Sequence, residues 1–171
     1  MKNARNIRNR KQVLFLGLCI FFVAGCAGTS GAGDLGLPGH FQSDVGLATA
    51  FDLRDKTRRV LDKYQFEVLR FEQSADMIYY ESQWKDRYPF QDELDQGIEG
   101  TRPRIIIQGK PRTRRKNQSD VFSVKFNAEN QVRLRETNDW NYAVISPMAK
   151  TYLKQFSDDL ETEYRSGLRR F

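Results

Sequence analysis

The chain has 171 residues, two cysteines and a formal net charge of +6. Five of its 28 basic residues, and none of its 22 acidic residues, lie in residues 1–25, so the rest of the chain carries 23 basic against 22 acidic residues. The high isoelectric point therefore comes mainly from the N-terminus. It gives no support to a nucleic-acid-binding protein, whose basic charge would lie on the folded domain.

The N-terminus has the layout of a secretory signal peptide. A basic segment precedes an uncharged apolar run over residues 13–25, which is shorter than the roughly 20 apolar residues that a membrane-spanning helix needs. The run ends in Val23-Ala24-Gly25-Cys26, which resembles the lipobox of bacterial lipoproteins. The alternative is an ordinary signal peptide with a cysteine at this place by chance.

The lipobox resemblance implies that residues 1–25 are removed and that Cys26 becomes the first residue, with a diacylglyceryl group on its sulfur. Ala27 follows the cysteine, and by proteobacterial sorting rules this implies an anchor in the outer membrane, on its periplasmic face. Cys19 lies in the removed segment. No thiol then remains for a disulfide, even in an oxidising compartment.

Three parts are predicted from the composition along the chain. Residues 1–25 are the signal peptide, and residues 26–40 are the lipidated cysteine and a flexible tether rich in glycine. Residues 41–171 are long enough for one domain with one core. We expect this single domain to lie in the periplasm.

The first half of the domain is predicted to contain a helix and a hairpin. The helix covers about residues 44–64, with Ser43 or Asp44 as its cap. A two-residue apolar period with many aromatic residues then predicts strands over 65–72 and 77–84.

The second half is predicted to contain further strands and a closing helix. A long loop is expected over residues 85–101 and a polar loop over 110–118. The closing helix begins at Pro147, after Ser146 as cap, and ends near Gly167. The expected strands cover residues 104–108, 120–126 and 131–136, the last as a fifth strand or an extension of the fourth. This order predicts an α+β fold, with an antiparallel sheet of four or five strands and the N-terminal and C-terminal helices packed on one face.

Residues 60–84, "VLDKYQFEVLRFEQSADMIYYESQW", carry a second resemblance. A helix ending in an aromatic residue, a strand, a polar turn and a strand closing on Trp84 resemble domains of the component-C lipoprotein of the outer-membrane β-barrel assembly machinery. That family usually has a glycine where Lys63 stands, and its lipoprotein has two such domains. The resemblance implies an accessory subunit of an envelope assembly complex.

The sequence offers little to a catalytic or metal site. His40 is the single histidine, and it falls in the expected tether, which disfavours a catalytic triad or a histidine-based metal site. The acidic residues of the long loop lack the ligand spacing of a calcium loop, and we expect them to be solvated; they are Asp92, Glu93, Asp95 and Glu99. We expect no enzyme activity, no cofactor and no metal.

A basic stretch over residues 101–118 is a candidate anion-binding site. Arginine can hold phosphate or carboxylate through paired hydrogen bonds, and lipopolysaccharide and peptidoglycan offer these anions in the envelope. The alternative is a hairpin tip whose charges prevent edge-to-edge pairing of strands. The candidate residues are Arg102, Arg104, Lys110, Arg112, Arg114, Arg115 and Lys116.

A group of aromatic residues is a candidate interface for a protein partner. Exposed aromatic clusters anchor many protein interfaces, although core packing is the alternative for such residues. The group consists of Tyr79, Tyr80, Trp84, Tyr88 and Phe90. The expected function is a membrane-anchored, non-catalytic binding or scaffold module with an envelope protein as partner. The alternative is direct binding of an anionic polymer or lipid through the basic stretch.

Overall fold

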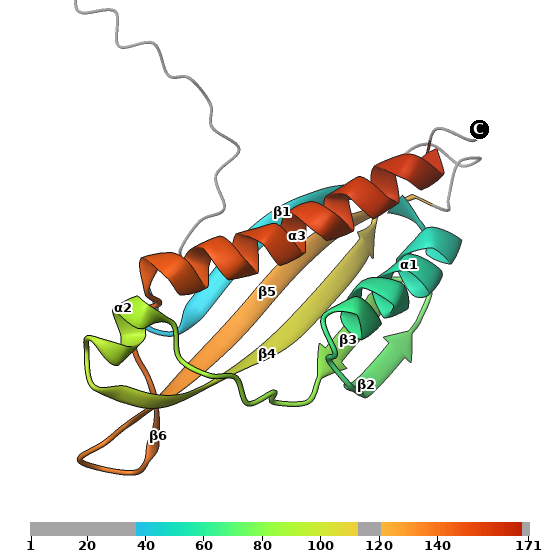
Figure 1. The fold of residues 1–171 in the computed structure, drawn as a ribbon. Coiled ribbons are helices and arrows are strands. Elements are labelled where there is room, and N and C mark those ends of the chain that lie inside the picture. The colour runs from blue at the N-terminus through green and yellow to red at the C-terminus, as the bar shows by residue number, and fades with distance from the viewer. Residues whose placement is uncertain (1–36, 113–120, 169–171) are drawn as a thin grey trace, which may run out of the picture.

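The computed structural model describes residues 37–112 and 121–168. These residues form an α+β domain, which confirms the predicted fold class (Figure 1). The elements in chain order are β1 (His40–Thr49), α1 (Ala50–Lys63), β2 (Val68–Gln73), β3 (Ile78–Ser82), α2 (Gln91–Leu94), β4 (Ile98–Pro111), β5 (Val121–Leu134), β6 (Trp140–Tyr142) and α3 (Pro147–Leu168).

The sheet is antiparallel throughout and has six strands in the described part of the chain. Five of them follow the order β1-β5-β4-β3-β2, so β4 is central and β1 and β2 are the outer strands. The short strand β6 pairs with Gln131–Arg133 of β5, beyond the place where His40 of β1 pairs with Glu129. β1 and β6 therefore share one edge of β5.

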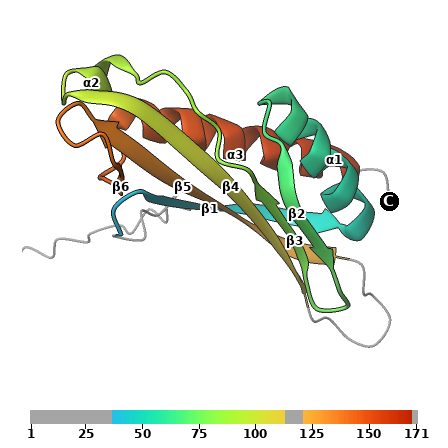
Figure 2. The same cartoon turned by 90° about the horizontal axis from the view of Figure 1, so that it is seen from below.

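The two long helices lie on the same side of the sheet (Figures 1 and 2). α3 runs along β1 and β5, and α1 packs beside it near β2 and β3. The core fills the space between helices and sheet. On α3 the buried hydrophobic residues are Ala149, Leu153, Phe156, Leu160 and Tyr164, and their spacing of three to four residues defines one helix face.

Phe156 lies at the centre of this core and is fully buried. Its ring lies 4.3 Å from Tyr64, 5.2 Å from Phe126 and 5.7 Å from Phe66, between ring centres. The helices are joined by a buried hydrogen bond of 2.6 Å between Thr57 Oγ1 and the Tyr164 hydroxyl. Burial of these apolar side chains is the main stabilising contribution to a domain of this length.

The helix predicted over residues 44–64 is wrong in its first part, because residues up to Thr49 belong to β1. A β-bulge between Asp44 and Gly46 inserts an extra residue into the strand, and Gly46 takes a positive φ of 95°. The buried residues Phe41, Val45 and Ala48 consequently have the spacing of a helix face. Thr49 ends the strand and caps α1, since its hydroxyl accepts a hydrogen bond from the backbone N–H of Asp52.

The central strands are longer than predicted. The "NAEN" stretch, expected as a turn, continues β5, and Ala128 and Asn130 are buried in it. Ala128 pairs with both β1 and β4, whereas Asn130 pairs with β4 and donates its backbone N–H to Gly39, just before β1. β4 begins at Ile98, inside the expected long loop, and α2 also lies in that loop. Pairing on both sides outweighs the turn propensity of asparagine. β6 was not predicted, and His40, expected in the tether, is the first residue of β1.

Candidate binding face of the sheet

One face of the sheet is packed against α1 and α3, and the opposite face, called the open face below, carries no helix within residues 37–112 and 121–168. Side chains alternate between the two faces of a strand. Buried residues of β4 and β5 therefore alternate with the polar residues of the open face. On these two strands the open face carries Arg102, Arg104, Ile106, Gln108, Lys110, Ser123, Lys125, Asn127, Glu129, Gln131 and Arg133.

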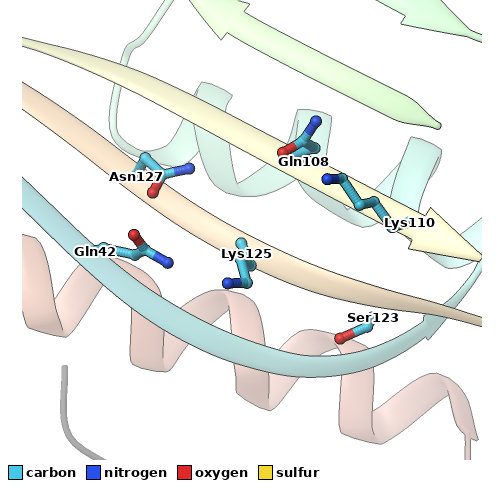
Figure 3. Close-up of a pocket in the computed structure, with 6 residues that line it drawn as sticks. All are labelled: Gln42, Gln108, Lys110, Ser123, Lys125 and Asn127. Atoms are coloured by element: carbon cyan, nitrogen blue, oxygen red, sulfur yellow. The ribbon is translucent and has the colours of Figure 1, made fainter. Parts of the chain in front are cut away.

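A shallow depression of about 380 Å³, called the lysine depression below, lies on this face across β1, β5 and β4 (Figure 3). None of the described residues that line it carries a carboxylate. They are Gln42, Gln108, Lys110, Ser123, Lys125 and Asn127. Amides, a hydroxyl and two ammonium groups together form a surface that can donate many hydrogen bonds to an anionic or polyhydroxylated ligand.

The two lysines of the depression have no ion pair among the described residues. Both are exposed, and they lie diagonally on neighbouring strands, because Gln108 pairs with Lys125 and Lys110 pairs with Ser123. Two like charges at this separation repel each other weakly. β4 and β5 are inner strands, so these lysines do not protect a sheet edge, which was the alternative explanation for Lys110.

At the other end of the open face, arginines and tryptophans alternate in an arginine–tryptophan stack. The Arg102 guanidinium lies 4.2 Å from the ring centre of Trp140 and 5.2 Å from that of Trp84. Arg104 lies 4.7 Å from Trp84, and Arg133 lies 5.3 Å from Trp140. Each contact adds about 0.5–1 kcal/mol when it is partly exposed. Both tryptophans of the chain are thus held on this face.

Arg104 joins the stack to two carboxylates. It donates hydrogen bonds of 2.8 Å to Glu81 and 2.7 Å to Glu129 from neighbouring strands. Burial opposes the charge of Arg104, but the hydrogen bond and charge of Glu129, with the charge of Glu81, outweigh it and raise the pKa of the guanidinium. Burial, and then the hydrogen bond to Glu81, raises the pKa of the Tyr79 hydroxyl.

The structure divides the predicted anion-binding residues. Arg102 and Arg104 lie on the open face but are engaged within the domain, since Arg102 also donates two hydrogen bonds to Gln131. Lys110 lines the lysine depression, and Arg112 is exposed at the end of the hairpin. Three members lie outside the described residues: Arg114, Arg115 and Lys116. Cys26 and the lipobox lie outside them too.

The predicted aromatic interface does not form one cluster. Tyr80 is buried in the core beneath α1, and Phe90 packs against the core with the Arg87 guanidinium 4.2 Å from its ring centre. Tyr79 and Trp84 lie on the open face. Tyr88 is 80% exposed in the loop before α2. Tyr79 and Trp84 are therefore the members that belong to the candidate binding face.

The acidic loop is partly structural rather than solvated. Glu93 is 1% exposed and its carboxylate accepts hydrogen bonds of 2.6 and 2.7 Å from Arg87 and one of 2.7 Å from the backbone N–H of Phe90. Asp92 accepts a hydrogen bond from the backbone N–H of Met148 at the start of α3. No group of three or more potential ligands that could hold a metal ion is found in the part of the chain that the structure describes.

Sequence reasoning missed several residues of the open face, among them Lys125, Asn127 and Gln131. A signal for them was present, because polar residues fill every second position from Ser123 to Arg133, between the buried residues of β5. Gln42 was missed because the β-bulge gives the buried residues of β1 the spacing of a helix. Trp140 lies in a strand of three residues, and no local pattern marks it.

The geometry thus gives a covered face that forms the core and an open face with a lysine depression and an arginine–tryptophan stack. Within the residues that the structure describes, no helix is long and apolar enough to cross a membrane. No protein-family model matches the sequence, and comparison with curated proteins gives no match.

Proposed function

We propose that this chain is a lipid-anchored, non-catalytic binding module on the periplasmic face of the outer membrane, and that it contacts an envelope protein through its open face. In this proposal, the lipid on the lipobox cysteine, Cys26, attaches the chain to the membrane. The domain acts as an accessory or scaffold subunit that keeps its partner close to the membrane. Neither a cofactor nor a metal has a role in the proposed function.

The arginine–tryptophan stack is the observation that carries this proposal. Tryptophan and arginine are enriched at the energetically important centres of protein interfaces. Trp84 and Trp140 are held in place by the guanidinium groups between and beside them. A partner that packs on these rings would lose little side-chain entropy, because the rings are already ordered.

Site-specific photocrosslinking in intact cells tests this proposal. A photoreactive phenylalanine replaces Tyr142, which is 44% exposed and pairs with Gln131 beside the stack. The matched control places the same residue at Gln155, which is exposed on α3. We expect one envelope protein to be captured at residue 142 and not at residue 155. The proposal is wrong if residue 142 captures no protein or captures the same proteins as residue 155.

A second candidate function is direct binding of an anionic envelope polymer or lipid. It is favoured by Lys110 and Lys125, because these lysines have no ion pair among the described residues. Reversal of both charges (Lys110→Glu with Lys125→Glu) should weaken binding to lipopolysaccharide vesicles or peptidoglycan about tenfold or more, and added salt should weaken wild-type binding in the same way. The control reverses two exposed charges on the helices, Arg59→Glu with Lys154→Glu. Equal binding by both double variants would contradict this candidate.

A further inference from the structure

β2 is an outer strand, and no strand among the described residues pairs with its free edge. All six of its residues are exposed, including Leu69 at 58% and Phe71 at 37%. The other outer strand, β1, is packed against α3. An exposed edge with apolar side chains is a template on which another strand can add through its backbone.

The register of β2 determines which backbone groups face this free edge. The N–H of Ser74 donates to the carbonyl of Met77 in the turn, at 2.8 Å. Hydrogen-bonded and non-hydrogen-bonded pairs alternate along an antiparallel ladder. Glu72 and Arg70 consequently bond toward β3, and the N–H and C=O of Phe71 and Gln73 are directed at the free edge. A new strand must therefore bond to Phe71 and Gln73.

The charges on β2 are self-complementary about Phe71. Arg70 and Glu72 flank it, share the open face and form an exposed ion pair. In a two-fold antiparallel arrangement centred on Phe71, Arg70 of each copy lies opposite Glu72 of the other. A shift of centre by one residue would place Arg70 opposite Arg70, or Glu72 opposite Glu72, and like charges at directly opposite positions are destabilising.

The hydrogen-bond pattern of β2 is compatible with this centre. With Phe71 on the axis, the two Phe71 residues form a hydrogen-bonded pair and exchange both backbone bonds. Arg70 and Glu72 then form non-hydrogen-bonded pairs, in which opposite side chains are closest. The free backbone groups of the strand therefore permit this register, and its charge order favours it over the neighbouring ones.

An apolar surface accompanies this edge on the helix side. The Phe71 ring lies 4.6 Å from Tyr80, between ring centres, and the Arg58 guanidinium lies 5.7 Å from it. Phe51 of α1 is 66% exposed and lines, with Phe71, a hollow of about 380 Å³. In the two-fold arrangement the two Phe71 rings lie side by side and would cover part of this surface.

We propose that two copies of this chain associate through their β2 strands, antiparallel and centred on Phe71, so that the two sheets become one. The partner at this edge is a second copy of the chain. Such an interface is isologous and closes on itself, so the assembly stops at a dimer. It uses neither the lysine depression nor the arginine–tryptophan stack.

Charge reversal on β2 tests the pairing and its register together. Two differently tagged full-length copies are co-expressed, solubilised with an excess of empty detergent micelles and purified through one tag. We expect wild-type copies to co-purify. Arg70→Glu in both copies should reduce the co-purified copy about tenfold, because the new carboxylate of each copy then lies opposite Glu72 of the other. Glu72→Arg in both copies should have the same effect.

A mixture of the two variants separates this proposal from misfolding. When one copy carries Arg70→Glu and the other Glu72→Arg, every opposite pair is again attractive, and co-purification should return to the wild-type level. Arg59→Glu, an equal charge change on α1, should leave it unchanged. Failure of wild-type copies to co-purify, capture of a different protein alone, or no recovery in the mixture would each overturn the proposal.

Discussion

The side chains on the two faces of the sheet are ordered by different kinds of interaction. The covered face is aromatic and aliphatic, and its residues are ordered by dense packing against α1 and α3. The open face is polar and charged, and its large side chains are ordered by cation–π contacts and ion pairs instead. Because its large side chains are already ordered, we expect the open face, rather than the covered face, to be the surface that binds the proposed partner.

The largest effect should come from the covered face. Phe156→Ala removes a fully buried ring that touches three other rings, and we expect a loss of about 3–5 kcal/mol in the free energy of unfolding. Ile106→Ala, on the open face and half-buried, should lose less than half as much. Urea denaturation of both variants measures the difference, and equal losses would contradict the contrast between the faces.

The next effect concerns the charge network of the open face. Arg104→Met leaves Glu81 and Glu129 without their common partner, at side-chain exposures of 13% and 16%. We expect a loss of about 1–3 kcal/mol in the free energy of unfolding. Arg104→Lys keeps the charge and should recover part of the lost stability. An unchanged midpoint in urea for Arg104→Met would show that the network does not order this face.

A smaller effect should follow from loosening the arginine–tryptophan stack. Arg102→Lys keeps the charge but loses the planar group between the two rings and the paired hydrogen bonds to Gln131. We expect about 1 kcal/mol of lost stability. The chain has two tryptophans, both in the stack, so the emission spectrum reports on this face directly. It should shift to longer wavelength, whereas Arg59→Glu on α1 should leave it unchanged.

The smallest effect that we expect is a pH-dependent loss of stability at a contact between the two long helices. Hydrogen bonds from Lys63 and then from Tyr64 lower the pKa of Asp159 in the folded domain. Its stabilising contribution is therefore complete above the unfolded pKa of about 3.9 and is lost as the pH falls through the lower, folded value.

We expect this contribution to be below about 1 kcal/mol, because the Asp159 side chain is 31% exposed. Asp159→Asn should lower the denaturation midpoint at pH 7 and have little effect at pH 2–3. Asp158→Asn, one residue away and more exposed, is the control and should change the midpoint less at pH 7. A loss for Asp159→Asn that is the same at both pH values would contradict the assignment.

Long periodic segments could be predicted from the sequence. The four-residue recurrence of Phe156, Leu160 and Tyr164 indicated α3, and Pro147 marked its start. The two-residue period of Phe122, Val124 and Phe126 indicated β5. These patterns are local, because burial of one face imposes them on each element separately. They were sufficient for the fold class.

The remaining features depend on contacts between distant residues. The bulge in β1 gives the buried residues of the strand the spacing of a helix. The strand can therefore be recognised only from its pairing with β5. The arginine–tryptophan stack brings together Trp84, Arg102 and Trp140 from three separate segments. The basic stretch was visible in the sequence, but the internal roles of Arg102 and Arg104 depend on Gln131, Glu81 and Glu129 across the sheet.

The start of β1 has a mechanical consequence. Any force that reaches the domain from its N-terminal segment passes first through Gly39 and His40. At this point the carbonyl of Gly39 accepts a 2.7 Å hydrogen bond from the N–H of Asn130, and the His40 ring stacks on Tyr142 at 5.3 Å. A pull on the N-terminal segment therefore has to break these contacts with β5 and β6 before it can separate β1 from the sheet.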